Sequence, residues 1–392
     1  MSKGRHISKN SRTSGRGLRV VIAGGGTGGH LFPGIAIAEA FRQRAADSRV
    51  LFVTTGRPIE TRVLSRTDYR TARIPAAGVK GKGVSGKLAA LVKVPAGILA
   101  ALALFIRFRP DAVIGMGGYS AAPVILAAWM MRIFRVIHEQ NRIPGMTNRF
   151  LAKYAHRIYV SFADTDMGGY AEKVRLTGNP IRTEIADQLS QEKTSGSTGS
   201  FTVLILGGSQ GAHAINMTVL AALSRLTGAQ AFRFIHQTGE VDVEKVQAGY
   251  ERAGIKARVS AFFDDMAACY ASADLAVCRA GATSVAEVAA AGLPAIFIPY
   301  PYAADNHQYF NAKSLSESGA AELIEQSALD GEHLAERINY YARHESVRRE
   351  MQAKIGAFAM PQAAAEIAAD ISGALESRKS KPKGRRTVLS IN

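Results

Sequence analysis

The stretch Gly24-Gly25-Gly26-Thr27-Gly28-Gly29, followed by His30, decides the fold of this 392-residue chain. An apolar segment, Leu18 to Ala23, precedes it, and a helix-like run, Gly34 to Phe41, follows it. A strand, a glycine loop and a helix in this order form a phosphate-binding corner, because glycines let backbone N–H groups approach an anion and the helix N-terminus adds partial positive charge. The stretch therefore predicts an α/β domain with a phosphate-binding loop.

Two later stretches, Gly115-Met116-Gly117-Gly118 and Gly207-Gly208-Ser209-Gln210-Gly211, repeat this corner. Around them apolar segments alternate with helix-like segments, which is typical of parallel sheets with helices on both faces. Strands are expected at 18–23, 49–54, 111–115, 134–138, 157–161, 173–176, 201–206, 231–236, 256–260, 274–277 and 295–298. Helices are expected at 34–45, 58–65, 86–107, 121–131, 146–154, 211–226, 241–253, 265–271, 283–291, 305–317 and 330–343.

The alternation restarts after the polar segment 188–200, so two similar domains are predicted, with a hinge near Gly178-Asn179-Pro180. The expected N-terminal domain is 18–181 and the expected C-terminal domain is 182–356. A final helix, at about 357–375, is expected to cross back onto the first domain.

The net charge of +17 is concentrated at the two ends of the chain. Residues 1–19 carry +6 and residues 376–392 carry +5, so the remainder is only modestly basic. We expect 1–17 and 376–392 to be disordered basic tails. Neither a zinc-ligand spacing nor an aromatic-rich ribonucleoprotein motif is present, so no nucleic-acid partner is expected. Only two cysteines, Cys269 and Cys278, occur, which favours a reducing, cytoplasmic setting.

The chain lacks residues that several classes of nucleotide-binding protein require. The first glycine loop matches the dinucleotide fingerprint, but the second predicted strand ends Phe52-Val53-Thr54-Thr55-Gly56 without the acid that holds a ribose. The Gly-Lys-Ser/Thr sequence of P-loop nucleotidases is absent. Neither Asp-x-Asp nor His-x-x-x-His occurs near these loops, so no metal is expected and helix termini, amides and arginines would carry leaving-group charge.

Two N-terminal polar elements are candidates for chemistry. His30 follows the glycines and has an unperturbed pKa near neutrality, so it could accept a proton from a hydroxyl; a helix-capping or packed histidine is the alternative. The segment 138–145 (His-Glu-Gln-Asn-Arg-Ile-Pro-Gly) follows a predicted strand, where α/β proteins place ligands; a solvated loop is the alternative.

The richest set of candidate residues lies in the second half. Arg279, the small residues 281–284 and Glu287 follow the predicted strand 274–277. Amides at the helix start could bind a diphosphate, and Glu287 could accept hydrogen bonds from two ribose hydroxyls. The later Asp305-Asn306-His307-Gln308 suits sugar hydroxyls. Each group alone could be a set of helix-capping residues or of ordinary polar surface residues, but together they predict a nucleotide-sugar pocket.

With these motifs the chain resembles the bacterial cell-wall glycosyltransferases that transfer N-acetylglucosamine to undecaprenyl-diphosphate-muramyl-pentapeptide (lipid I), forming lipid II. The resemblance covers nearly all of residues 18–375 in the family's order. The matching pieces are Gly25-Gly26-Thr27-Gly28-Gly29-His30, Gly117-Gly118-Tyr119, His138-Glu139-Gln140-Asn141, Gly178-Asn179-Pro180-Ile181-Arg182, Gly207-Gly208-Ser209-Gln210-Gly211-Ala212, Phe263-Asp264-Asp265-Met266, Arg279 through Glu287, and His307-Gln308 with Asn311-Ala312.

The resemblance implies a GT-B fold, in which two Rossmann-like, doubly wound parallel-sheet domains face each other across a cleft. It implies metal-independent transfer with inversion and no cofactor, in which the muramyl C4 hydroxyl displaces UDP in line and His30 is the candidate base. The implied acceptor-diphosphate site is Gly26, Gly117, Gly118 and Tyr119. The implied UDP-N-acetylglucosamine site is Thr27, Gly28, Gly29, Asn141, Arg182, Ser209, Phe263, Arg279, Ala282, Thr283, Ser284, Val285, Ala286, Glu287 and Gln308. His307, where many members carry Gln, and Phe263, often aliphatic, depart from the family pattern.

A lipid-linked acceptor requires the protein to reach a membrane. The segment Leu88 to Phe108 has apolar residues at helical spacing with basic residues around it, which favours anionic headgroups; a core-packed helix is the alternative. The expected location is peripheral, on the cytoplasmic face of the bacterial inner membrane, with other cell-wall synthesis proteins as possible partners. The expected membrane patch is Leu88, Leu91, Val92, Ile98, Leu102 and Phe105.

Three alternative functions remain open at the level of the sequence. Another GT-B transferase would use a diacylglycerol, sterol or antibiotic acceptor, although the paired N-terminal glycine loops favour a diphosphate. A UDP-sugar 2-epimerase of the same architecture would release UDP without an acceptor. A non-catalytic nucleotide-binding or nucleic-acid-associated protein would depend on the basic tails.

Overall fold

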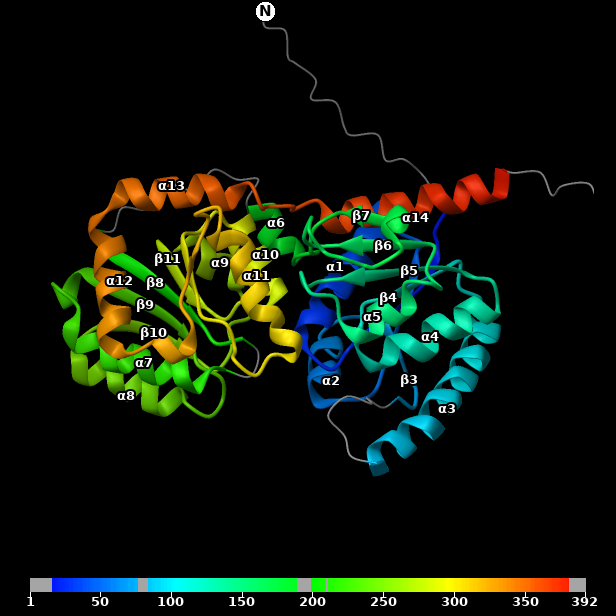
Figure 1. Ribbon diagram of the computed structural model, residues 1–392, viewed down its shortest axis with the longest axis horizontal. Helices are drawn as coiled ribbons and strands as arrows, with labels where there is room; N and C mark the ends of the chain where they lie inside the picture. Colours follow the sequence, from blue (N-terminus) through cyan, green and yellow to red (C-terminus); the bar gives the residue numbers. More distant parts are fainter. Residues whose placement is uncertain (1–15, 77–83, 189–198, 209–210, 381–392) are drawn as a thin grey trace, which may run out of the picture.

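In a computed structural model, residues 16–76, 84–188, 199–208 and 211–380 are described, and they form two α/β domains side by side (Figure 1). The N-terminal domain is on the right of Figure 1 and the C-terminal domain on the left. Both sheets are wholly parallel in the described chain, which confirms the predicted fold class. The expected basic tails at 1–15 and 381–392 lie outside the described residues.

The N-terminal sheet has the strand order β3-β2-β1-β4-β5-β6-β7. Its described strands are β1 (Arg19–Ala23), β2 (Arg49–Thr54), β3 (Arg70–Arg73), β4 (Ala112–Gly115), β5 (Phe134–Glu139), β6 (Arg157–Val160) and β7 (Val174–Leu176). The helices of this domain are α1 (Gly28–Arg44), α2 (Pro58–Leu64), α3 (Val84–Phe108), α4 (Gly118–Met130) and α5 (Met146–Leu151). The strand order reverses between β1 and β4, where Ala23 pairs with Gly115, so the first two glycine loops leave the sheet side by side.

The C-terminal sheet has the order β10-β9-β8-β11-β12-β13. Its strands are β8 (Phe201–Leu206), β9 (Phe232–Gln237), β10 (Lys256–Ser260), β11 (Leu275–Cys278), β12 (Ala295–Phe297) and β13 (Glu322–Leu323). Its helices are α6 (Thr183–Gln188), α7 (His213–Ala222), α8 (Val243–Ala253), α9 (Met266–Ala271), α10 (Ala282–Ala290), α11 (His307–Ser316), α12 (Gly331–Arg343) and α13 (Glu345–Gly356). Here the order reverses between β8 and β11, so Gly207 and Gly208, which follow β8, leave the sheet beside the strand that leads to α10.

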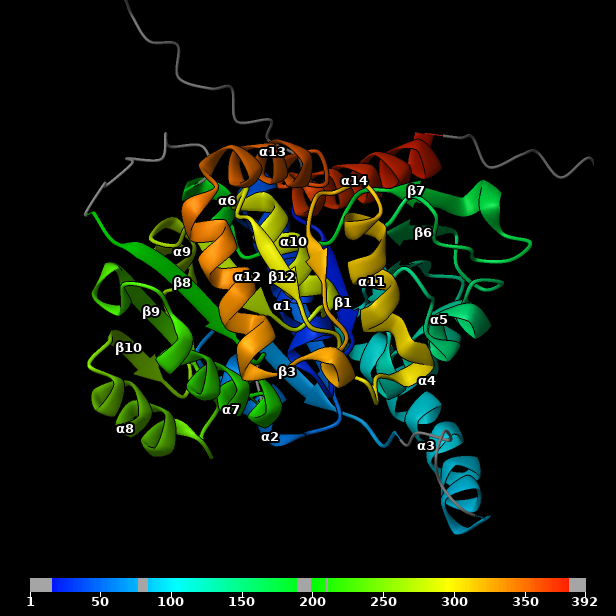
Figure 2. The ribbon, with the colours of Figure 1, turned by 60° about the vertical axis from the view of Figure 1, so that its left-hand side comes forward.

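The central strands are apolar along their whole length because helices cover both faces of each sheet. In β1, Val20, Val21 and Ile22 are all at most 1% exposed. Helix α1 reaches across to contact α10 of the other domain, so the two switch points face each other (Figure 2).

The chain crosses between the domains twice. After α13 it returns, and α14 (Ala363–Ser380, red in Figure 1) lies along the N-terminal domain against α1. Ile367 and Ile371 of α14 are buried in the same apolar cluster as Ile37 and Phe41 of α1. Because α14 continues to Ser380, residues 376–380 are helical, and the expectation of a disordered tail over them is wrong.

The elements that the sequence did not predict are β3, β13, α6 and α13. Strand β3 reads Arg-Thr-Ala-Arg and lies at the sheet edge, so it lacks the apolar run used to find strands. Strand β13 has only two residues, and α13 is mostly polar, with Met351 and Ile355 as its buried residues. Helix α1 begins at Gly28, six residues earlier than predicted, because Gly28 and Gly29 take helical backbone conformations despite their low helix propensity.

Candidate active site

The first two glycine loops contact each other at the N-terminal switch point. Gly26, Gly117 and Gly118 have φ angles of 90°, 91° and 73°, which side-chain-bearing residues rarely adopt. A Cβ atom on Gly118 would lie 2.9 Å from the carbonyl oxygen of Gly25, and one on Gly117 would lie 3.2 Å from Cε1 of His30. The loops fit together, with His30 against them, only because these positions carry no side chain.

The start of α1 presents backbone donors beside these loops. Thr27 is the N-cap residue and has extended backbone angles, but its side chain accepts no capping hydrogen bond. The first N–H groups of a helix have no partner within the helix, so those of Gly28 and Gly29 can bind an anion. Tyr119, at the start of α4, is 41% exposed, and its ring lies 5.9 Å from the guanidinium carbon of Arg57.

A hydrogen-bond chain ties His30 to the hinge. Nδ1 of His30 is 2.9 Å from Oε1 of Gln140. Nε2 of Gln140 donates to the carbonyl oxygen of Met116 at 3.0 Å and to Nδ1 of the fully buried His138 at 3.0 Å. Nε2 of His138 in turn donates to the carbonyl oxygen of Gly178 at 3.1 Å.

This chain fixes the proton positions on His30. The amide nitrogen of Gln140 faces the Met116 carbonyl, so its oxygen faces His30 and accepts the proton on Nδ1. Nε2 of His30 is therefore left with its lone pair. Burial lowers the pKa of His30 below its ordinary value, although the charge of Glu139 opposes this effect, so the ring is neutral near pH 7. Burial also lowers the pKa of His138, to about 4.

Glu139 holds the 138–145 segment in place. Its carboxylate accepts hydrogen bonds from the backbone N–H groups of Asn141 and Gly145, both at 3.0 Å, and from Nδ2 of Asn148 at 2.8 Å. The side chain is 2% exposed. Glu139 therefore stabilises the loop that presents Asn141 to the cleft.

Asn141 is joined to the C-terminal domain through the buried Asn311 of α11. Nδ2 of Asn311 donates to Oδ1 of Asn141 and to the carbonyl oxygen of Ala280, both at 3.1 Å. Oδ1 of Asn311 accepts from the backbone N–H of Arg142 at 3.0 Å. This one side chain thus links the two domains beside the start of α10.

The N-terminus of α10 is the second set of backbone donors. Gly281 is its N-cap, and the first intrahelical bond runs from the Val285 N–H to the Gly281 carbonyl at 2.9 Å. The N–H groups of residues 282–284 therefore have no acceptor in the helix. Val285 is buried and Ala286 is half-buried, so their side chains belong to the packing of α10.

Glu287, one turn into α10, is already paired. Nε and Nη2 of Arg182 each lie 2.9 Å from one of its oxygens, and the Tyr270 hydroxyl donates to it at 3.0 Å. Although burial opposes it, the Glu287 carboxylate raises the pKa of Arg182. The guanidinium carbon of Arg182 lies 5.4 Å from the ring centroid of Phe32 in α1, so this ion pair sits at the contact between the domains.

Arg279 does not stand free for a diphosphate. Its Nη1 donates to the carbonyl oxygens of Ile298 and Pro299 at 3.2 and 3.1 Å, and its Nη2 donates to Oε1 of Gln326 at 2.7 Å. Burial lowers the pKa of Arg279, which is 8% exposed. Its terminal nitrogens hold the loop after β12, and the expectation that this side chain binds the donor stays a prediction.

The third glycine loop is tied to Phe263 through Gln237. Nε2 of Gln237 donates to the carbonyl oxygen of Gly208 at 3.2 Å, and its Oε1 accepts from the backbone N–H of Phe263 at 3.1 Å. Gly208 has a φ of 83°. Ser209 lies outside the described residues, so its predicted place near the diphosphate is not tested.

Gln308 lies at the start of α11 on the cleft side of the C-terminal domain. Its Oε1 accepts from the Tyr300 backbone N–H at 2.9 Å, which leaves its amide nitrogen as a donor for a ligand. Nδ1 of His307 is 2.7 Å from the Ala304 carbonyl oxygen. The charge of His307 is a smaller cause, after burial, of the lowered pKa of His30.

The exposed apolar stripe of α3 differs from the predicted membrane patch. Phe105 is only 1% exposed and packs in the core, so its place in the patch is wrong, and Ile98 and Leu102 are half-buried against the same core. Helix α3 instead exposes Val92, Leu99 and Ile106, each 67% accessible and seven residues apart. The side chains of Leu88 and Leu91 lie outside the described residues.

The described residues contain neither a cluster of metal ligands nor a membrane-spanning helix. Within 16–76, 84–188, 199–208 and 211–380, no group of three or more His, Cys, Asp and Glu side chains is placed to hold a metal ion. Over the same residues, no helix has both the length and the apolar character needed to cross a bilayer.

Comparison with known proteins agrees with this geometry. The N-terminal domain of glycosyltransferase family 28 matches residues 20–160, and the family's C-terminal domain matches residues 202–367. The UDP-N-acetylglucosamine–N-acetylmuramyl-(pentapeptide) pyrophosphoryl-undecaprenol N-acetylglucosamine transferase of Syntrophus aciditrophicus is 45% identical over 89% of this chain and 97% of its own length. The Geobacter sulfurreducens enzyme of the same name is 50% identical over 82% and 89%. This chain belongs to that transferase family.

Solved structures support the same assignment. The crystal structure of Acinetobacter baumannii MurG matches this family member with a TM-score of 0.74 and 32% identity, covering 91% of this chain and 99% of that one. A kitacinnamycin glycosyltransferase and a UDP-N-acetylglucosamine 2-epimerase from Listeria monocytogenes match with TM-scores of 0.67 and 0.65 at 15% and 13% identity. At those identities the likeness shows the shared two-domain fold alone, and the predicted GT-B fold and family are confirmed.

Four residues that shape this site had no predicted role. Gln140 and Asn311 lie in the motifs that carried the resemblance, but only the fold shows that one aligns His30 and the other joins the domains. Tyr270 and Gln237 had no signal in the sequence, because their partners Glu287 and Phe263 lie 17 and 26 positions away.

Replacing Gly118 by Ala should destabilise the protein by about 2 kcal/mol or more, because the residue would be left-handed and its Cβ would press on the Gly25 carbonyl. Urea unfolding measures the loss. Gly169→Ala is the control, since a Cβ there meets nothing within 4 Å and its φ is not positive. Equal stability of the two variants would contradict the close packing of the loops.

Proposed function

We propose that this chain transfers N-acetylglucosamine from UDP-N-acetylglucosamine to the C4 hydroxyl of lipid I, with inversion, to give β(1→4)-linked lipid II. The observation that carries the proposal is the facing pair of switch points, one with two glycine loops around His30 and the other with the free amides of α10. One side binds an acceptor diphosphate and the other a donor diphosphate.

The donor would bind mainly to the C-terminal domain. The amides of residues 282–284 face its diphosphate, and Glu287 accepts the ribose hydroxyls. Because Glu287 now holds Arg182, we propose that the diphosphate draws the guanidinium toward itself as the ribose arrives. The backbone N–H of Phe263 already donates to Oε1 of Gln237. The backbone carbonyl of Phe263 is therefore the group that would accept a hydrogen bond from uracil.

The sugar would lie between the domains, bounded by Asn141 and the amides of Gly28 and Gly29 on one side and by Gln308 on the other. The acceptor diphosphate would lie on Gly26, Gly117 and Gly118, with Tyr119 beside it. These glycine positions let phosphate oxygens reach backbone N–H groups that a side chain would screen.

In the reaction, the C4 hydroxyl attacks the anomeric carbon and the bond to UDP breaks on the opposite face. Nε2 of His30 accepts the hydroxyl proton, and the positive charge on the ring spreads toward Nδ1, which already donates to Gln140. The amides at α10 and the Arg182 guanidinium stabilise the charge that develops on UDP.

The lipid tail of the acceptor requires a membrane surface. We propose that the stripe of Val92, Leu99 and Ile106 enters the cytoplasmic leaflet of the inner membrane, with anionic headgroups near the basic residues that flank α3. In this proposal the protein lies peripherally on the cytoplasmic face of the membrane, where other cell-wall synthesis proteins could reach it.

The decisive assay measures UDP release from UDP-N-acetylglucosamine with and without a lipid I analogue. Release that needs the analogue and yields a disaccharide product is expected. EDTA should leave the rate unchanged. Release without an acceptor would instead indicate an epimerase or hydrolase, and bound UDP with no release would indicate a different acceptor.

His30→Ala should lower kcat by about 10²- to 10⁴-fold, because the proton acceptor is lost, while the Kd for UDP stays within about twofold. Single-turnover kinetics and calorimetry separate the two effects. His333→Ala, at a half-buried position of α12 in the C-terminal domain, is the matched control. The lowered pKa of His30 predicts that activity, which needs the neutral ring, declines only below about pH 6.5, its unperturbed value. Equal losses in turnover and UDP affinity would exclude the base role.

Leu99→Glu combined with Ile106→Glu should weaken vesicle binding at least tenfold, because each apolar side chain contributes about 2 kcal/mol when buried. Co-sedimentation with phosphatidylglycerol vesicles measures this, and circular dichroism checks the fold. Val241→Glu, at a side chain 91% exposed on the other domain, is the control. Unchanged vesicle binding by the folded double variant would refute this membrane contact.

A further inference from the structure

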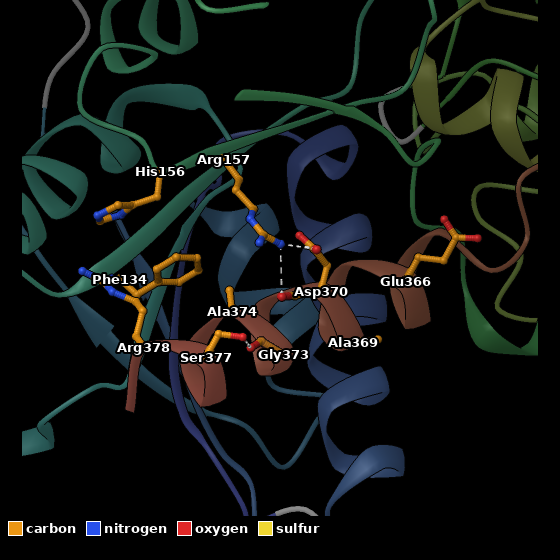
Figure 3. Close-up of a pocket in the computed structure, with 10 residues that line it drawn as sticks. All are labelled: Phe134, His156, Arg157, Glu366, Ala369, Asp370, Gly373, Ala374, Ser377 and Arg378. Carbon is orange, nitrogen blue, oxygen red and sulfur yellow. Dashed lines mark hydrogen bonds and ion pairs between the residues drawn. The ribbon is translucent and has the colours of Figure 1, made fainter. Parts of the chain in front are cut away.

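A basic hollow lies at the end of the N-terminal domain away from the cleft. Its volume is about 690 Å³, and it forms where α4 ends, β5 and β6 begin and α14 passes over them. Figure 3 shows the adjoining hollow, which shares His156 and Arg378 with it. The residues that line the basic hollow are Trp129, Met130, Arg132, Arg135, His156 and Arg378.

This hollow holds positive charge without a compensating carboxylate. Among the described residues no acid forms an ion pair with Arg132, Arg135 or Arg378, and no acid lines the basic hollow. The nearby Asp370 is already paired with Arg157 and accepts from the Tyr159 hydroxyl at 2.7 Å. Glu366 lies at the far end of the adjoining hollow in Figure 3.

The charge of the arginines also acts on the neighbouring titratable groups. Burial and then the charges of Arg135 and Arg378 lower the pKa of His156 to about 4. Burial and then the charge of Arg378 lower the pKa of Arg135. Like charges that repel each other in this way are stabilised when an anion binds among them.

The donors are held in place before any anion arrives. The His156 ring stacks on Phe134 with centroids 5.0 Å apart, and the Arg378 guanidinium carbon lies 5.4 Å from the same Phe134 centroid. Figure 3 shows Arg378 rising from α14 to this ring beside His156. Nδ1 of His156 lies 3.2 Å from the backbone nitrogen of Arg135 and 3.3 Å from its carbonyl oxygen, which holds the ring against the start of β5. Arg135 is 9% exposed, and its Nε has no hydrogen-bond partner.

We propose that Arg135, His156 and Arg378 form a binding site for a phosphate-type anion, either free phosphate or the headgroup of an anionic phospholipid. Two guanidinium groups beside an imidazole ring around one hollow supply charge-assisted donors that phosphate prefers. Arg378 lies beyond residue 367, where the family 28 match ends, so the site depends on the helix with which this chain extends past that match. It is separate from the cleft and independent of the transfer reaction.

The test compares Arg378→Gln, Arg135→Gln and the unaltered full chain. Arg225→Gln, an exposed arginine of the C-terminal domain, is the matched control for the loss of one charge. Inorganic phosphate is titrated by calorimetry at constant ionic strength. Binding to phosphatidylglycerol vesicles is measured against phosphatidylcholine vesicles. The Kd for UDP is measured in every variant and should not change.

Phosphate affinity that falls about tenfold or more in Arg378→Gln, but not in Arg225→Gln, supports the site. The ligand is a lipid headgroup if Arg378→Gln also reduces binding to phosphatidylglycerol vesicles but not to phosphatidylcholine vesicles, and if phosphate competes with that binding. The ligand is free phosphate if Arg378→Gln leaves vesicle binding unchanged. Arg378 is exposed, so its variant should fold even if Arg135→Gln does not. No phosphate binding, or equal binding by all four proteins, overturns the proposal.

Discussion

The contact between the two N-terminal glycine loops is the constraint on which the site depends. Gly118 approaches the Gly25 carbonyl so closely that a Cβ atom would lie 2.9 Å from it, and Gly117 approaches the His30 ring in the same way. This packing sets the position of the imidazole, and Gln140 then sets its tautomer through bonds to both His30 and the second loop. The backbone conformation of the two loops thus determines where the imidazole lies, and side-chain hydrogen bonds determine which of its nitrogens carries the proton.

The opposite side of the cleft is organised by charge. In the described structure the Glu287 carboxylate, the Arg182 guanidinium and the Tyr270 hydroxyl satisfy one another at the place where the two domains meet. A buried ion pair of this kind is costly to break by removing one partner, because the other charge is left buried and uncompensated. The proposed exchange, in which the donor ribose replaces Arg182 at Glu287, therefore requires the donor diphosphate to take up the Arg182 guanidinium.

Much of the fold followed from the sequence, because parallel strands buried on both faces leave apolar runs that are easy to recognise, as in β1, β4 and β8. Two of the four missed elements, β3 and α13, are polar elements whose place is set by neighbours rather than by their own pattern. The predicted site residues belong to local motifs, which a sequence can show. Residue type and spacing do not say which way a side chain turns. Phe105 turns into the core, so its place in the patch was misjudged, and Arg279 turns to the loop after β12, which the sequence did not predict.

The packing of α14 on the N-terminal domain affects how the protein folds during its synthesis. The N-terminal domain is built from residues near the start of the chain and from a helix at 363–380, and its apolar cluster includes Ile367, Ile371 and Leu375. During synthesis the first sheet leaves the ribosome before α14. The face of α1 that α14 covers, which includes Ile37 and Phe41, stays exposed until the entire C-terminal domain has been translated. Domains generally fold in the order in which they emerge from the ribosome. The N-terminal domain therefore begins to fold first but keeps an exposed, aggregation-prone apolar surface. Helix α14, the last described helix to be translated, completes it.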